Sequence, residues 1–177
     1  MDNYTLAPFA AAVYTANTVD RLALSKFVEK QKALRARVGG VLQEVLFDTE
    51  GAVTGLNAVD VATNRRIPIT RPVNNDDECG LDVSALVQTA AIINKAIDDR
   101  LDLVVIEKFG ELEQNGQGLI DEIFKTISAG IPLLISVPEA ALPLWQERSG
   151  ELGAVLSFSE AAFQQWWQGV AGQAGTG

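Results

Sequence analysis

Three short apolar runs constrain the fold of this chain more than any other feature of its sequence. Residues 9–14 (FAAAVY), 101–106 (LDLVVI) and 131–137 (IPLLISV) hold a single charged residue between them. Runs of this length are typical of strands that are buried on both faces of a parallel sheet. The helical patterns between them predict an α/β fold in which helices wrap a mostly parallel sheet, with ligands beyond the carboxyl ends of the strands.

Apolar residues at helical spacing mark the segments that we expect to be helices. The predicted helices cover residues 19–37, 84–99, 120–130, 143–148 and 159–170. Asn17 or Thr18 is the expected N-cap of the first helix, and a capping box from Ser157 to Glu160 is expected to begin the last one. The second helix is expected to bury Leu86, Val87, Ala90, Ile93 and Ile97 on one face.

A β-rich segment interrupts the alternation of strands and helices. Strand-like runs cover residues 38–47, 53–61 and 66–70. Residues 48–51 (DTEG) form a turn signal between the first two runs. The sequence therefore predicts a small antiparallel insertion at about residues 40–72.

Composition narrows the classes of partner and chemistry. The chain has 23 acidic and 14 basic residues, a net charge of -9, so we expect it to repel nucleic acids. No run reaches the roughly 18–20 apolar residues of a membrane helix, so no membrane insertion is expected. Histidine is absent and Cys79 is the only cysteine, which excludes imidazole catalysis and disulfides and favours the cytoplasm. One domain over residues 1–170, with a disordered tail at 171–177, suits this length.

The loop after the first strand, residues 15–20, is where a phosphate is expected in such a fold, because backbone N–H groups and a helix N-terminus converge there. A working P-loop has the pattern GxxxxGK[ST], and this loop has neither glycine nor lysine. Thr15, Asn17, Thr18 and Asp20 remain as candidate anion ligands. The same residue types before a helix also serve as plain caps, and both interpretations stay open.

A carboxylate and a basic cluster complete the candidate site. Glu107 directly follows the apolar residues 103–106, which is the Walker-B arrangement for holding Mg²⁺. An acid at a strand end also occurs where a chain simply returns to solvent. Arg65, Arg66 and Arg71 can bind phosphate or another oxyanion through paired hydrogen bonds, or they can form an exposed face of a hairpin.

The segment at residues 106–123, IEKFGELEQNGQGLIDEI, resembles the small P-loop nucleoside-triphosphatases of bacteria and archaea. Residues 38–69 resemble the hairpin insertion of the same family. The resemblance implies that Glu107 is the acid associated with Mg²⁺ and that Glu113 is the final glutamate of the motif. Lys108 stands where that family has its catalytic glutamate. Because lysine cannot polarise an attacking water as a carboxylate does, hydrolysis loses its base.

A closer resemblance is to a bacterial family of degenerate P-loop NTPase-like proteins that occurs near molybdate-transport genes, whose members carry the name molybdenum transporter ATP-binding protein. It is carried by Lys108-Phe109-Gly110, Glu113 and Gly116-Gln117-Gly118-Leu119, and it covers roughly residues 8–150. The resemblance implies a P-loop NTPase-like three-layer sandwich and a theme of molybdenum handling.

Three functions remain open. The first is a non-hydrolytic protein that binds a small anion, either a Mg²⁺-nucleotide or an oxyanion such as molybdate, at the loop, Glu107 and the arginines. The second is an interaction or regulatory protein that kept the P-loop scaffold without a ligand and binds a protein partner or itself through an apolar patch with Trp167. The third is a slow nucleoside-triphosphatase. The molybdate assignment rests on the family resemblance alone.

Overall fold

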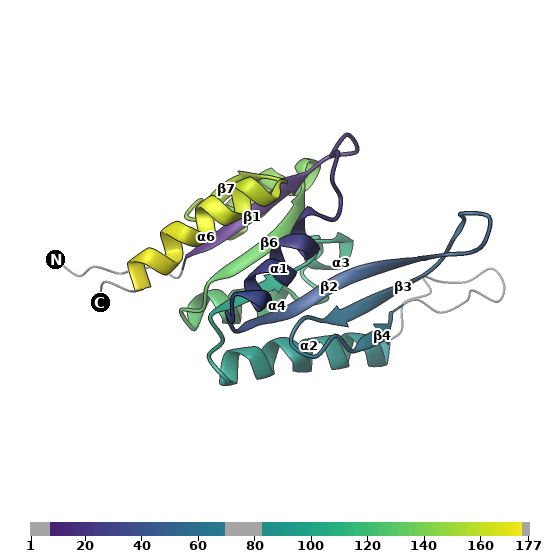
Figure 1. Cartoon of the computed structure of the whole chain (residues 1–177), viewed down its shortest axis with the longest axis horizontal. Helices are drawn as coiled ribbons and strands as arrows, with labels where there is room; N and C mark the ends of the chain where they lie inside the picture. Colours follow the sequence, from purple (N-terminus) through teal and green to yellow (C-terminus); the bar gives the residue numbers. More distant parts are fainter. Residues whose placement is uncertain (1–7, 70–82, 175–177) are drawn as a thin grey trace.

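The computed structural model describes residues 8–69 and 83–174. The strands are β1 (Phe9–Tyr14), β2 (Val38–Phe47), β3 (Val53–Asp60), β4 (Arg66–Pro68), β5 (Leu103–Ile106), β6 (Leu133–Pro138) and β7 (Ala154–Ser157). The helices are α1 (Ala23–Ala33), α2 (Val83–Asp98), α3 (Glu111–Gln114), α4 (Ile120–Ser128), the 3-10 helix η1 (Glu139–Ala141), α5 (Leu142–Arg148) and α6 (Glu160–Ala174). Figure 1 shows their arrangement.

The strands form one seven-stranded sheet in the order β4-β3-β2-β5-β6-β1-β7 within the described residues. The neighbours from β2 through β5, β6 and β1 to β7 are parallel. The strands β2, β3 and β4 pair antiparallel. The predicted α/β fold with a mostly parallel sheet and an antiparallel segment is confirmed.

Strand β2 belongs to both parts of this sheet. Residues Val38–Val41 pair in parallel with β5, and the strand then continues as a hairpin with β3. Gly40, with φ of 116°, lies in the parallel part, where a Cβ would overlap the carbonyl oxygen of Val105. The antiparallel segment is therefore a continuation of the central sheet, and its hairpin extends beyond the helical layers (Figure 1).

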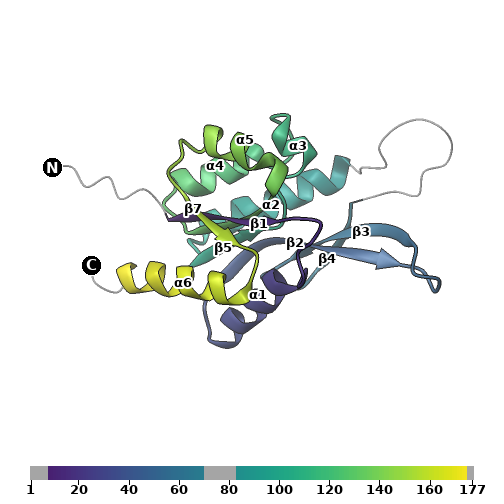
Figure 2. The ribbon, with the colours of Figure 1, turned by 90° about the horizontal axis from the view of Figure 1, so that it is seen from above.

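Helices cover both faces of the sheet. Helices α1 and α6 lie on one face, and α2, α3, α4 and α5 lie on the other (Figure 2). On the four-helix face, the Trp145 ring packs edge-on against Phe9 and Phe109, with centroids 6.2 and 5.3 Å away. On the other face, Phe27 and Phe163 pack at 5.9 Å. The amphipathic segments are stable as helices because each segment buries an apolar stripe against the sheet, and these aromatic contacts belong to the buried stripes.

Helix α1 is shorter than predicted. It begins at Ala23 instead of residue 19, because the Asp20 carboxylate accepts the N–H of Leu22 at 3.0 Å and so holds a separate turn before the helix. The expected N-caps Asn17 and Thr18 do not cap it. The helix ends at Ala33, before Arg35 with a left-handed φ of 67°.

Two details of the other helices also differ from the sequence patterns. The capping box from Ser157 was wrong, since Ser157 is the last residue of β7 and the Ser159 hydroxyl accepts the N–H of Ala162 at 3.1 Å. Val87 of α2 is 66% exposed, whereas Ala85 is buried, so the buried face is rotated from the predicted one.

The two adjacent tryptophans of α6 lie side by side. Trp166 and Trp167 are both half-buried against the core beneath α1 and α6, with ring centroids 6.2 Å apart. Trp167 is thus not an outward contact residue of the kind that the sequence left open. No helix in the described part of the chain is long and apolar enough to cross a membrane.

Candidate functional site

A cavity of about 770 Å³ lies beyond the carboxyl ends of the central strands. Its lining comes from the end of β1, the start of α1, the β2–β3 hairpin, and the residues that follow β5. The polar and charged residues that line it include Tyr14, Arg21, Gln43, Glu107, Lys108 and Ser136. The position agrees with the expectation for a parallel sheet, because loops diverge there and leave room for a ligand.

Glu107 is the first residue after β5. Its N–H donates to the carbonyl oxygen of Val41 at 2.8 Å, and its carboxylate accepts the N–H of Gln43 at 2.6 Å. Burial raises the pKa of Glu107, and the Gln43 N–H and the Lys108 charge offset part of that rise. The carboxyl group is therefore held at the edge of β2 and faces the cavity.

Lys108 adopts an unusual backbone conformation beside this carboxyl group. Its φ is 100°, a region that residues with a side chain rarely enter, and its N–H donates to the carbonyl oxygen of Ile106 at 3.2 Å. The chain then crosses toward β6, where the N–H of Phe109 donates to the carbonyl oxygen of Ser136 at 2.8 Å. This tight turn directs an exposed lysine side chain into the cavity lining.

Arg21 approaches the cavity from the segment before α1. Its guanidinium carbon lies 5.1 Å from the centroid of the Tyr14 ring, a cation–π arrangement. Burial raises the pKa of the Tyr14 hydroxyl, and the Arg21 charge offsets part of that rise. Neither Arg21 nor Lys108 forms an ion pair with any described residue. The cavity is therefore lined by two cations that form no ion pair with a described residue, together with the carboxylates of Glu29, Glu44 and Glu107.

Several backbone N–H groups of the loop at residues 15–20 donate to other groups of the same loop. The Thr15 N–H donates to the Thr18 hydroxyl at 2.9 Å, the Asn17 N–H donates to the Thr15 hydroxyl at 3.1 Å, and the Thr18 N–H donates to the Thr15 carbonyl at 3.2 Å. Asp20 pairs with Lys26 at 2.9 Å, and its hydrogen bond with that lysine lowers the pKa of Asp20. None of these four predicted ligands lines the cavity.

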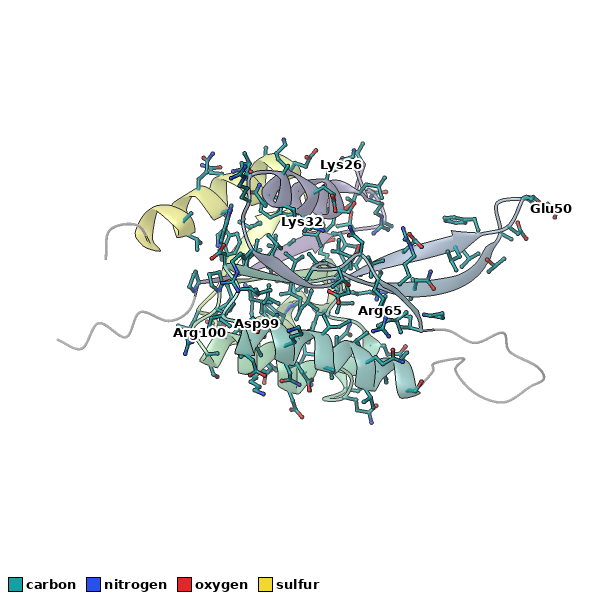
Figure 3. The ribbon with its side chains drawn as sticks, turned by 60° about the horizontal axis from the view of Figure 1, so that its bottom comes forward. Lys26, Lys32, Glu50, Arg65, Asp99 and Arg100 are labelled. Carbon is teal, nitrogen blue, oxygen red and sulfur yellow. The ribbon has the colours of Figure 1, made fainter. Side chains whose placement is uncertain are left out.

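The predicted arginine cluster is divided between the two faces of the sheet. Arg66 pairs with Glu44 at 2.9 Å and lines the 770 Å³ cavity. Arg65 donates to Gln88 of α2 at 2.8 Å, on the other face (Figure 3), and lines a separate cavity of about 500 Å³. Neighbouring residues of an extended chain point to opposite faces, which explains the division. Arg71 lies outside the described residues, as does Cys79.

Glu113 is buried below the loop that follows α3. Its carboxylate accepts the N–H of Leu119 at 3.3 Å, and Arg148 donates to its backbone carbonyl at 2.7 Å. The structure places it away from the lining of the 770 Å³ cavity, where it organises the glycine-containing loop. Of the predicted site residues, Glu107, Lys108 and Arg66 are brought together.

The structure adds several residues that the sequence patterns did not single out. Tyr14, Arg21, Gln43 and Ser136 line the cavity. Of these, Arg21 could have been found from the sequence, because it directly follows the loop at 15–20 and a P-loop has its lysine at the corresponding end of the loop. The described part of the chain contains no group of three or more acidic, cysteine or histidine residues that could hold a metal ion alone.

Comparison with known proteins identifies the fold and the family. The structure is similar to the crystal structure of THEP1 from the hyperthermophile Aquifex aeolicus, with a TM-score of 0.62, 14% identity, and coverage of 92% of this chain and 95% of that one. The fold is thus P-loop NTPase-like.

A relative in sequence is the molybdenum import ATP-binding protein ModC 2 of Bradyrhizobium diazoefficiens. It is 34% identical over 146 residues, which are 82% of this chain and 16% of that relative. The two resemblances inferred from the sequence are confirmed. Residues 9–166 match the family described as "protein of unknown function (DUF2478)", and the chain belongs to that family.

Proposed function

We propose that this chain is a non-hydrolytic nucleotide-binding protein that takes part in molybdenum handling. The observation that carries the proposal is the pair of cations, Arg21 and Lys108, that face a cavity at the carboxyl ends of the strands without carboxylate partners among the described residues. Unpaired guanidinium and ammonium groups form strong charge-assisted hydrogen bonds with phosphate oxygens. Of the three carboxylates that line the same cavity, Glu44 is paired with Arg66 and Glu29 with Lys32, which leaves Glu107. The net charge of -9 elsewhere opposes the attraction only weakly, because salt screens charges beyond about 8–10 Å.

The size of the cavity favours a nucleotide over a bare tetrahedral oxyanion. A volume of about 770 Å³ lies within the range of roughly 300–1,000 Å³ that organic ligands occupy. The lining also includes apolar residues such as Leu22 and Phe158, which suit a base or another planar ring. Molybdate alone would leave most of this volume and all of this apolar surface unused.

The absence of turnover is proposed from the residues that flank the cavity. Lys108 supplies no carboxylate to polarise water, and the loop at 15–20 contains no lysine and spends several of its N–H groups on internal bonds. Mg²⁺ commonly binds through one or two carboxylates together with the phosphates of its nucleotide. Glu107 would be that carboxylate, and the ion would neutralise phosphate charge.

The link to molybdenum is supported by the relative in Bradyrhizobium, whose name gives molybdenum import and ATP binding. This chain corresponds to 16% of that relative, so it represents one module of a longer protein there. We propose that the present chain serves the same process.

Thermal unfolding of the purified protein tests the proposal. The ligands are ATP, ADP and GTP with and without Mg²⁺, and molybdate, tungstate, phosphate and sulfate at matched ionic strength. A ligand at 100 times its Kd adds about 2.7 kcal/mol, which raises Tm by about 5–10 °C for a chain of this size. We expect a shift with nucleotides and no shift with sulfate. No shift with any ligand would contradict the proposal.

The internal hydrogen bonds of the loop at 15–20 favour a second candidate, an interaction protein that kept the scaffold and lost its ligand. The substitution Lys108→Glu gives a one-sided test, because it restores a carboxylate beside Glu107 but removes a phosphate-binding cation. A gain of Mg²⁺-dependent phosphate release by this variant would support nucleotide docking in the cavity against the interaction protein. If the wild type already releases phosphate at a comparable rate, the chain is a slow nucleoside-triphosphatase instead.

A further inference from the structure

One edge of β2 has no neighbouring strand among the described residues. Strand β5 pairs with β2 only at Val38–Val41 and ends at Ile106. Strand β2 continues to Phe47, in the hairpin that extends beyond the sheet in Figure 1. From Gln43 onward, the side of β2 that faced β5 therefore borders the 770 Å³ cavity, and Gln43, Val45 and Phe47 all line it.

The hydrogen bonds on either side of the hairpin identify which backbone groups face this edge. The carbonyl of Val41 and the N–H of Gln43 both bond to Glu107, on the β5 side. Alternate residues of a strand direct their backbone groups to the same side, so Val45 directs its N–H and carbonyl there too. Its partner in β3, Leu56, agrees with this register, because the Leu56 carbonyl faces the opposite way and accepts the N–H of Ile69.

At the start of this edge, the Glu107 carboxylate takes the place of a backbone carbonyl from a neighbouring strand. This carboxylate occupies the N–H of Gln43, where a neighbouring strand would place a backbone carbonyl. The following groups, on Val45 and Phe47, have no strand beside them within the described residues. The edge is thus open from Val45 onward to an added strand with one end beside Glu107.

The side chains of this edge do not protect it. Strand edges are commonly blocked by lysine, proline or an inward charge. Here Val45 is 45% exposed and Phe47 is 62% exposed, and the one charged residue between Gln43 and Phe47, Glu44, is paired with Arg66. Backbone groups with exposed apolar side chains beside them are the features that bind an extended peptide by strand addition.

The charges beside the edge select the occupant. Lys108 follows Glu107 at the Gln43 end, and Arg21 lines the same cavity beside Tyr14; neither forms an ion pair with a described carboxylate, and the Glu107 carboxylate at this end is already bonded to the Gln43 N–H. A peptide that runs antiparallel to β2 brings its C-terminal end to these two cations. We propose that the open edge of β2, from Gln43 to Phe47, binds an extended segment of a partner protein by antiparallel strand addition, with acidic residues at the C-terminal end of the segment facing Lys108 and Arg21.

A second copy of the chain fits this edge less well. Pairing two β2 edges about Val45 would place Asp48 of one copy opposite Leu42 of the other. That position is already taken, because the register of β5 with β2 puts Glu107 beside Leu42. A flexible segment that stops at Glu107 avoids the overlap. The proposal does not rest on nucleotide binding and goes beyond it.

The test uses a fluorescent heptapeptide in which threonine and valine alternate and which ends in two glutamates, titrated with the full chain in the absence of nucleotide. Two N-methylated forms of the peptide carry the methyl groups on alternate sets of amides. Only one set can face β2, so we expect one form to bind about tenfold more weakly or worse and the other to bind almost normally. Equal weakening of both forms would overturn the proposal.

Protein variants locate the site. Val45→Pro removes the N–H at the open edge without removing a β2–β3 bond, and Val45→Thr is the matched control that keeps it. We expect the proline variant alone to weaken binding by about tenfold, with its thermal transition retained. Lys108→Gln should weaken the glutamate-ended peptide and leave a glutamine-ended one unchanged. Absence of binding to the folded protein, or self-association of the free chain that Val45→Pro abolishes, would refute the assignment. Either result leaves the nucleotide proposal intact.

Discussion

Replacing Gly40 by alanine tests the junction that holds the hairpin to the central sheet. Gly40 has φ of 116°, and an added Cβ would overlap the backbone carbonyl oxygen of Val105 in β5. A positive φ costs a residue with a side chain about 1–2 kcal/mol. Separating the strands at this point removes about two ladder hydrogen bonds, each contributing about 0.5–1.5 kcal/mol. We therefore expect a loss of about 2–5 kcal/mol in the free energy of unfolding.

Urea unfolding followed by tryptophan fluorescence measures this loss. With a slope of about 2 kcal/mol per M, the midpoint of Gly40→Ala should fall by about 1–2.5 M. Gly51→Ala is the matched control, because Gly51 has φ of 84° in the hairpin turn and no atom within 4 Å of the added Cβ. Gly51→Ala loses only the roughly 1–2 kcal/mol that a positive φ costs, so its urea midpoint should fall by about 0.5–1 M. A Gly40→Ala midpoint no lower than that of Gly51→Ala would refute the close approach of β2 and β5.

Two further predictions concern the site and the last helix. Burial raises the pKa of Glu107 in the folded protein, so the contribution of this carboxyl group to stability is full below its ordinary pKa of 4.5 and declines as the pH rises through the raised pKa. Glu107→Gln should therefore gain stability relative to the wild type across that window. Urea midpoints of the two proteins that stay parallel between pH 4 and 8 would contradict this. Ser159→Ala should lower the free energy of unfolding by about 0.5–2 kcal/mol through loss of the α6 cap, while Ser157→Ala should change it by less than about 0.5 kcal/mol; the reverse order would restore the capping box at Ser157.

The strands could be predicted from the sequence because the information is local. An apolar run such as residues 9–14 is buried on both faces, and β1 has these bounds. The start of α1 could not be placed, because caps at Asn17 or Thr18 and the turn made by Asp20 use the same residue types. Arg65 and Arg66 were grouped as neighbours, although the alternation of an extended chain separates them.

The composition of the site depends on long-range contacts. Glu107 was predicted because strand and carboxylate are adjacent in sequence, and Lys108 was singled out by the family resemblance. Arg21 and Gln43 were missed because they reach the cavity only when α1 and the hairpin pack beside β5. Conversely, Glu113 matches a family motif, yet its neighbours Leu119 and Arg148 hold it in the interior of a loop.

Calorimetric titration of ADP with Mg²⁺ into the wild type, Arg21→Gln, Lys108→Gln and Lys30→Gln tests the central claim most directly. Lys30 is an exposed lysine of α1 near Glu160, away from the cavity, so it controls for the loss of one charge. We expect the wild type to bind, the first two variants to bind at least about tenfold more weakly, and Lys30→Gln to match the wild type. Equal affinities for all four proteins, or no binding by the wild type, would contradict a nucleotide site built on Arg21 and Lys108.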